Sequence, residues 1–451
     1  MILFRTRRPG YRTLGLLLAL MLVSGILSAA VPAGADGVPA AAGALLDAGT
    51  VVNAKMKTLA AGTDTQYHAR TDQIKAIRMA DSLPDGFAPS EANTVSAADS
   101  AYPVYIFFDN RDDAGILYFW TEGGTIAMHP DSACLFSNHT ALTDISGIAG
   151  WDASRVAYMY GMFMGDVSLP DALALRDWDT SSVTDMRFMF YRATAMLFID
   201  VSGWNTSKVW SMEGMFAVGD NWKANGQLRE IAGLGNLDVS NVTDMTCMFY
   251  GAGQMMYYDI GGWDVSKVTS MNHMFCDNRE LRSLDLSKWD VSSLRTVYCM
   301  FDDNVKLTTI GDVSHWNTVN LIDAGAWLNE CCSFVGDNTG TLDLSGWDTR
   351  NLKSTGEMFV RTKIRTIDLT GWTFESMTND GWEDAGRGIY YEFGNMMEES
   401  RGFGRMFDGA TQLRMVWVSQ EGYDTFNAAV ERGVNTQNMW RHAKTEVFAI
   451  R

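Results

Sequence analysis

The sequence predicts a repeat solenoid, and three observations lead to this prediction. A tryptophan-centred phrase recurs about every 26 residues, Met and Trp are unusually frequent at 27 and 15 of 451 residues, and one repeat alone is too small to fold. With 47% hydrophobic and 20% charged residues, the composition is that of an ordinary globular protein. Disordered and collagen-like classes are therefore excluded.

The first 35 residues have the pattern of a bacterial-type secretory signal. A basic start precedes an apolar run from Leu14 to Leu27, and Ala33-Gly34-Ala35 offers a cleavage site. The apolar run is short for a membrane span. We therefore expect an extracellular protein, secreted or at the cell surface, with no membrane insertion after the signal is cleaved. The Ala-rich residues 36–100 are expected to form a flexible or partly helical lead-in.

The net charge of the chain limits the classes of partner it can bind, and the spacing of its cysteines bears on whether they form disulfides. Acidic residues outnumber basic ones by 54 to 36, for a formal net charge of −18. Such a polyanion repels phosphate backbones and anionic lipid, so we expect no nucleic-acid partner. The six cysteines show no framework spacing, which favours mostly reduced thiols in small apolar sites.

The repeat is the phrase Trp-Asp-x-Ser-x-Val-x-x-Met-x-x-Met-Phe. Clear copies begin at Trp151, Trp178, Trp204, Leu237, Trp263 and Trp289, and weaker ones at Trp316, Trp347 and Trp372. In the copy from Trp263, the residues Val268, Met271, Met274 and Phe275 have the spacing of one helical face. The preceding serine, Ser266, is a suitable N-cap. Each repeat is therefore expected to carry a short helix.

The second half of each repeat alternates as a short strand does. Leu284 and Leu286 flank Asp285, and similar triplets recur in other copies. Burying the apolar side chains of one unit contributes roughly 12 to 24 kcal/mol, whereas ordering its residues costs roughly 40 kcal/mol. Units must therefore stack, with strands paired about 4.8 Å apart in one parallel sheet. Residues 126–420 would hold about ten repeats, and residues 421–451 would cap the last coil.

The repeated phrases resemble the BspA family of leucine-rich-repeat surface proteins, also described as bacterial 26-residue surface repeats. Aromatic segments upstream, such as Tyr102 to Tyr105 and Gly115 to Trp120, look like the N-terminal cap of that family, here residues 101–125. The resemblance implies a leucine-rich-repeat-like solenoid with short parallel strands on one face and short helical turns on the other. It also implies an adhesin-like protein that binds host extracellular matrix or surface proteins or other bacterial cells.

Sequence motifs for catalysis are missing. The chain has no His-Glu-x-x-His, no nucleophile elbow, no phosphate-binding Gly-x-x-x-x-Gly-Lys and no EF-hand loop. Cys134 and His139 lie close in sequence, but coincidence explains this pair better than a catalytic nucleophile does. We therefore expect no enzyme activity, no cofactor and no metal.

Repetition creates an acidic column that no single copy shows. It consists of Asp200, Asp259, Asp285, Asp312, Asp343 and Asp368, all expected on the outer face of the sheet. Like charges on neighbouring strands destabilise a sheet, so something must offset their repulsion. Water, salt and local hydrogen bonds are one explanation, and a basic protein stripe or divalent cations recruited by the column are the other. A second column after each Trp, from Asp152 to Asp348, is interpreted as bonding its own turn.

Insertions are the other candidate binding surface. In the unit from Trp372, about 23 extra residues precede Met406. The aromatic residues of this insertion considered as partner-binding candidates are Trp382, Tyr390, Tyr391 and Phe393. Tyr and Trp dominate interface hot spots, and repeat proteins place insertions on their binding faces. Packing of these rings over the solenoid edge is the alternative.

The leading functional hypothesis is an exported adhesin-like repeat protein. A carbohydrate-binding module is one alternative, because exposed Trp and Tyr beside carboxylates also suit sugars. A structural cell-envelope protein without a dedicated ligand is the other.

Overall fold

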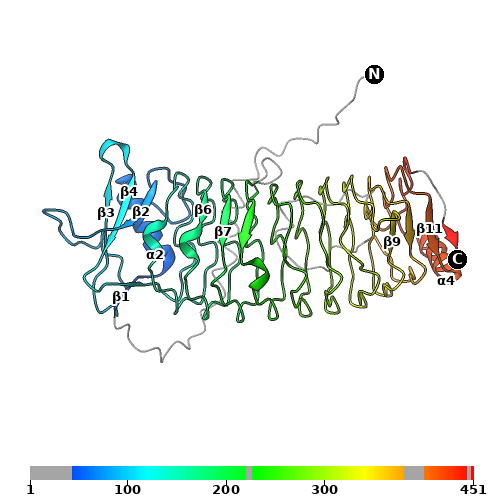
Figure 1. Cartoon of the computed structure of the whole chain (residues 1–451), viewed down its shortest axis with the longest axis horizontal. Helices are drawn as coiled ribbons and strands as arrows, with labels where there is room; N and C mark the ends of the chain where they lie inside the picture. The colour runs from blue at the N-terminus through cyan, green and yellow to red at the C-terminus, as the bar shows by residue number, and fades with distance from the viewer. Residues whose placement is uncertain (1–42, 220–225, 380–400, 444–447) are drawn as a thin grey trace, which may run out of the picture. The chain divides into compact units, whose positions relative to one another are not determined.

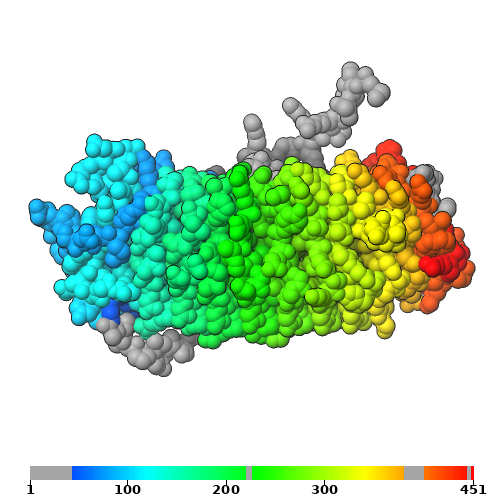
Figure 2. All heavy atoms as spheres, in the orientation of Figure 1, coloured from blue at the N-terminus to red at the C-terminus, as the bar shows by residue number. Residues whose placement is uncertain are grey.

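The computed structural model describes residues 43–219, 226–379, 401–443 and 448–451. In these residues short strands and turns predominate, and consecutive coils lie side by side in the order of the sequence (Figure 1). Figure 2 shows that successive coils pack directly on one another. No helix in this part of the chain is long and apolar enough to cross a membrane.

The N-terminal part contains a small mixed sheet. Strand β2 (Ala76–Met79) pairs in parallel with β4 (Ile116–Trp120), which pairs antiparallel with β3 (Tyr105–Asp109). Leu117 and Phe119 of β4 are fully buried while their chain neighbours are partly exposed, as expected for a strand with one face on the core. A single 3-10 turn, η1 (Arg111–Asp113), joins β3 to β4.

The segment expected as a lead-in is packed from residue 43 onward. Strand β1 (Ala44–Leu45) pairs in parallel with β5 (Ile126–Ala127). Helix α2 (Gly49–Ala61) buries Val52 and Met56 in the common core. The N-terminal cap therefore includes residues well before the predicted boundary at residue 101.

The coils that follow pair through two parallel ladders. The first ladder contains the assigned strands β6 (Asp171–Ala172), β7 (Phe198–Asp200) and β8 (Glu230–Ala232) in one sheet, and β9 (Thr341–Asp343), β10 (Thr366–Asp368), β11 (Met415–Val418) and β12 (Ala449–Ile450) in another. We call the outward side of this ladder the strand face. The 3-10 turns η2 (Ser146–Ile148), η3 (Leu173–Leu175) and η4 (Leu234–Asn236) lie beside it in the early coils. These repeated parallel strands and turns are consistent with a repeat solenoid.

The second ladder consists of single-residue parallel bridges. It joins, one coil to the next, Asp131, Tyr158, Asp185, Ser211, Asp244, Ser270, Thr296, Asp323 and Ser354. The side chains at the fourth and sixth positions after each repeat Trp form a surface that we call the bridge face. In the repeat that begins at Leu237, the positions are counted from Leu237. The sequence analysis did not foresee this ladder, because it assigned these residues to a helix.

The predicted short helix of each repeat is wrong. In the Met-x-x-Met-Phe segment the residue before the second Met has positive φ, as at Cys247 (56°) and His273 (54°), and a second such residue follows four positions later. A left-handed residue interrupts a right-handed helix. The predicted N-cap serines instead donate their own N–H groups, as Ser266 does to Asp264 Oδ1 at 3.1 Å.

These turns direct their hydrogen bonds along the stack. The N–H groups of Met159, Gly161 and Phe163 donate to the carbonyls of Asp185, Arg187 and Met189 in the next coil, at 2.8–2.9 Å. Every second N–H group therefore bonds between coils rather than within a helix, which ties each repeat to its neighbour.

The Trp, Val, Met and Phe columns form the core, as predicted. All the repeat tryptophans are at most 6% exposed. The Phe column stacks from coil to coil, with centroids 5.7 Å apart between Phe163 and Phe190 and 5.5 Å apart between Phe275 and Phe301. None of the six cysteines forms a disulfide, and five of them are buried.

Candidate functional site

The acidic column predicted from the repeat lies on the strand face. Ile199 and Val201, which flank Asp200, are at most 1% exposed, and the apolar side chains that flank the other five aspartates are at most 8% exposed. Gly311 replaces the apolar residue before Asp312. Asp259, Asp285, Asp312 and Asp343 are exposed, whereas Asp200 and Asp368 are half-buried. The predicted alternation of buried apolar and outward acidic side chains is therefore present.

Most of these carboxylates are bonded within their own turn. The Oδ1 atom of Asp285 accepts the N–H of Ser287 at 3.1 Å and also its hydroxyl at 2.5 Å. These bonds favour the charged form and lower the pKa of Asp285. Equivalent bonds from the N–H group two residues later reach Asp200, Asp312, Asp343 and Asp368. Local hydrogen bonds, one of the two explanations offered for the column, are thus present at five of its six members.

The column is also less continuous than expected. Asp343 and Asp368 are register partners on β9 and β10, but Ala232 is the partner of Asp200 on β8. Asp368 forms an ion pair with Arg451, with 3.0 Å between Arg451 Nη1 and Asp368 Oδ2. The carboxylates therefore repel one another less than a complete ladder would.

Asp259 is the exception in the column. No hydrogen bond or ion pair joins its carboxylate to another residue in the described ranges, and it lines a hollow of about 550 Å³ next to β8. Gly233, with a φ of 78°, and Gly235 make this hollow possible, because a Cβ on Gly235 would lie 2.7 Å from Asp259 Oδ2. Arg229 and Tyr257 also line it.

Large apolar side chains are exposed in this hollow and on the two coils of the strand face before it. Tyr257 is 58% exposed, Met256 43% and Phe198 39%, and Leu173, directly after β6, is 53% exposed. Phe198 is the register partner of Glu230, which lines the hollow. We call Leu173, Phe198, Met256, Tyr257 and Asp259 the Tyr257 patch. Exposed aromatic and Met side chains are typical of protein interfaces.

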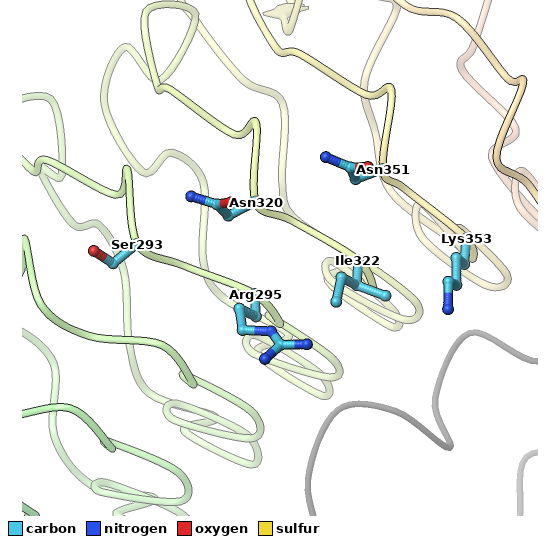
Figure 3. Close-up of a pocket in the computed structure, with 6 residues that line it drawn as sticks. All are labelled: Ser293, Arg295, Asn320, Ile322, Asn351 and Lys353. Atoms are coloured by element: carbon cyan, nitrogen blue, oxygen red, sulfur yellow. The ribbon is translucent and has the colours of Figure 1, made fainter.

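A second hollow, of about 420 Å³, lies on the bridge face. Its lining consists of Ser293, Arg295, Asn320, Ile322, Asn351 and Lys353 (Figure 3). Three successive coils each contribute two of these residues, at equivalent positions of the repeat. Leu294, Leu321 and Leu352, which lie between the members of each pair, are at most 2% exposed. This period-two burial is that of a strand.

The sequence analysis missed this second hollow. The signal was available in phrases such as Lys267-Val268-Thr269 and Asn241-Val242-Thr243, where β-branched residues alternate with polar ones. The helical interpretation of the following Met and Phe residues extended over these positions and concealed the alternation.

The post-Trp acidic column has the role that was predicted for it. Each Asp or Asn at this position accepts the N–H group two residues later, for example Ser154 to Asp152 at 2.9 Å and Ser292 to Asp290 at 2.9 Å. Asn205 and Asn317 do the same. These side chains therefore stabilise their own turns, which is the role predicted for them, and we do not assign them to ligand binding.

The predicted insertion residues Trp382, Tyr390, Tyr391 and Phe393 lie outside the described residues. Within the described ranges, no three His, Cys, Asp or Glu residues are grouped so as to hold a metal ion. Burial raises the pKa of the Cys134 thiol to about 12, so it is a poor nucleophile at neutral pH. The chemistry available at both hollows is that of binding, through ionic, amide and apolar contacts.

Sequence comparison identifies the repeat. The family described as "Mycoplasma protein of unknown function, DUF285" matches at residues 131–231, 220–341 and 311–381, which together span more than half of the 451 residues. The chain belongs to the DUF285 family. The DUF285 matches fall on the coils of both ladders, so the DUF285 region contains both hollows. No curated protein matches the chain.

Proposed function

We propose that this protein is a secreted or cell-surface solenoid, leucine-rich-repeat-like and related to the BspA family, that adheres to a macromolecular partner through the strand face. The partner would be a host matrix or surface protein, or a component of other bacterial cells. The secretory pattern of the first 35 residues and the repeated DUF285 matches support this proposal.

One observation supports the choice of face. Ten large hydrophobic side chains are exposed in the described residues, and four of them belong to the Tyr257 patch. A patch of this kind next to a carboxylate without a local partner suits a protein surface with an apolar contact and a basic group. Asp259 is therefore the member of the acidic column that we assign to partner binding, and the other five serve their own turns.

Binding of the mature protein, from residue 36 onward, to immobilised matrix proteins and to bacterial cells tests this proposal. Tyr257→Ala and Phe198→Ala are expected to weaken binding about tenfold or more, because aromatic side chains that a bound partner covers are common hot spots. Asp259→Asn should weaken it less and reduce its dependence on salt.

The matched control is Trp210→Ala, which removes an aromatic side chain that is 44% exposed on the bridge face. Thermal melts would confirm that each variant is folded. If Trp210→Ala weakens binding while Tyr257→Ala and Phe198→Ala do not, the strand face is not the adhesive surface. Binding to a glycan array but to no protein or cell would favour the carbohydrate-binding alternative.

A further inference from the structure

We propose that the bridge face carries a second binding site, for an acidic saccharide, in the hollow between Arg295 and Lys353 (Figure 3). This site differs from the proposed adhesive surface in its face, its charge and its ligand. It lies on a face whose outward rows include Arg155, Lys208, Lys267, Arg295 and Lys353.

The charge of the bridge face is opposite to that of the whole chain. Acidic residues outnumber basic ones by 54 to 36 overall, yet the two rows of the bridge face contain no carboxylate. The fourth-position row is Arg155, Ser182, Lys208, Asn241, Lys267, Ser293, Asn320, Asn351 and Ser376. The sixth-position row is Ala157, Thr184, Trp210, Thr243, Thr269, Arg295, Ile322, Lys353 and Thr378. The face is thus positive and otherwise neutral.

The backbone holds the lining of the hollow in a regular array. The N–H of Ile322 donates to the carbonyl of Arg295 at 2.7 Å, and the N–H of Lys353 donates to the carbonyl of Ile322 at 2.8 Å. The three side chains therefore follow one another at the strand spacing of about 4.8 Å. A ligand with repeated polar groups would meet an equivalent side chain in each coil.

The two amide side chains are fixed in the same way. Asn320 Nδ2 donates to the carbonyl of Ser292 at 2.7 Å, and Asn351 Nδ2 donates to that of Val319 at 2.7 Å. Each amide is thereby oriented before any ligand arrives. A pre-oriented amide loses less side-chain entropy on binding a hydroxyl group.

The acidic residues closest in sequence to the lining are engaged elsewhere, and Asp290 accepts the N–H of Ser292 at 2.9 Å. Asp348 forms an ion pair with Arg350 at 2.7 Å, and Asn317 stands where other repeats have Asp. The carboxylate of Asp323 is buried and accepts the N–H of Gly325 at 2.8 Å. Arg295 is exposed, and no ion pair connects it to a carboxylate in the described part of the chain. Its guanidinium can therefore form a bidentate pair with a carboxylate or sulfate.

The lining favours a saccharide over a nucleic acid. Ser293, Asn320 and Asn351 supply hydroxyl and amide groups for sugar hydroxyls, and Ile322 supplies an apolar contact for a sugar ring. Among the residues that the structure describes, no aromatic ring lines the hollow, so this lining lacks the stacking platform on which single-stranded nucleic acids depend. The net charge of −18 also opposes a long polyphosphate.

Calorimetric titration of the mature protein with heparin oligosaccharides and with oligogalacturonate tests the proposal, with neutral dextran and inorganic polyphosphate as comparison probes. At least one of the two acidic saccharides should bind, and added salt should weaken that binding. The Arg295→Gln variant should bind it about tenfold more weakly, because a bidentate charge-assisted contact is lost.

The matched control is Lys288→Gln, which removes one exposed basic residue outside both rows and should leave saccharide binding unchanged. Tyr257→Ala should also leave it unchanged, which separates this site from the adhesive surface. The proposal would be overturned by unchanged affinity in Arg295→Gln, by equal binding of dextran, by a preference for polyphosphate or by no binding of either acidic saccharide.

Discussion

Seven of the eight repeat tryptophans combine apolar burial with a bond to a carbonyl of the preceding coil, whereas the indole N–H of Trp151 donates to Met79 Sδ. The indole N–H of Trp204 donates to the carbonyl of Leu175 at 2.8 Å, and that of Trp372 donates to Leu344 at 2.9 Å. A buried indole requires such a partner. Five other repeat tryptophans make the same contact, namely Trp178, Trp263, Trp289, Trp316 and Trp347. The recurrence of Trp therefore has a polar cause as well as an apolar one.

Asp323 makes the stability of the chain depend on pH. It is fully buried, and burial raises the pKa of its carboxyl from 3.8 to about 7. Because the folded state holds this proton more tightly than the unfolded state, the free energy of unfolding falls as pH rises from about 4 to about 7. Asp323→Asn keeps an acceptor for the Gly325 N–H without a charge. At about pH 8 it should raise the free energy of unfolding by about 4 kcal/mol, with little change near pH 4.

Thermal melts of both chains at the two pH values check this prediction. Asp185→Asn is the matched control, because Asp185 occupies the same repeat position but forms an ion pair with Arg187 at 2.7 Å. The control should lower the melting temperature at both pH values. An equal rise for Asp323→Asn at both pH values would contradict the assigned role of the buried charge.

At the scale of the element, the distinctive unit is a turn with two left-handed residues four positions apart. Examples are Cys247 with Gly251, Cys299 with Asp303, and Arg405 with Gly409. Glycine occupies the second position in several coils, whereas other coils place a larger residue there at a cost of about 1–2 kcal/mol. The bonds to the next coil, such as Asp303 N–H to Asn329 O at 3.0 Å, offset that cost.

Asp303, at a φ of 61°, provides a test of this turn. Asp303→Gly and Asp303→Ala remove the same carboxylate, and they differ chiefly in backbone strain. We expect the glycine variant to be the more stable of the two by about 1 kcal/mol in urea unfolding. At Lys288, whose φ is not positive, the order should be reversed, with alanine the more stable. If alanine is equal or better at Asp303, the left-handed turn is not a source of strain.

The sequence predicted the strands but not these turns, and the reason is physical. Alternation around Asp200, Asp343 and Asp368 is a local pattern, and β7, β9 and β10 lie there. The Met-x-x-Met-Phe spacing is compatible with a helix. It is equally compatible with a turn in which every second N–H group bonds to the next coil. Contacts between coils decide whether this segment forms a helix or a turn, and the sequence of a single repeat does not contain those contacts.

The candidate sites also divide into one that the sequence predicted and two that it did not. The acidic column follows from alternation and was predicted. Met256 and Tyr257 line a hollow that Gly233 of the preceding coil also lines, and the hollow at Arg295 needs three coils in place. Both features are properties of neighbouring repeats, which explains why they emerged only from the structure.

At the scale of the whole molecule, a stack of coils must protect the core of its last unit. Helix α4 (Gln420–Glu431) and residues near the C-terminus pack on that core. Ring centroids lie 4.9 Å apart between Phe403 and Phe426 and 4.5 Å apart between Phe407 and Trp440. Strand β12 extends the parallel sheet beside β11. Residues 420–443 and 448–451 therefore cover aromatic side chains that would otherwise face water.

Removing residues 420–451 should destabilise the stack from its C-terminal end. Because coils contact chiefly their neighbours, we expect limited proteolysis to cut first among residues 401–419 while residues 131–341 stay protected. Phe426→Ala, which keeps the helix but removes one packed ring, should lower the melting temperature in the same direction. Val430→Ala, on the same helix but 37% exposed, should not. Uniform loss of protection along the chain would mean that the coils unfold as one unit, and the nearest-neighbour account of their stability would fail.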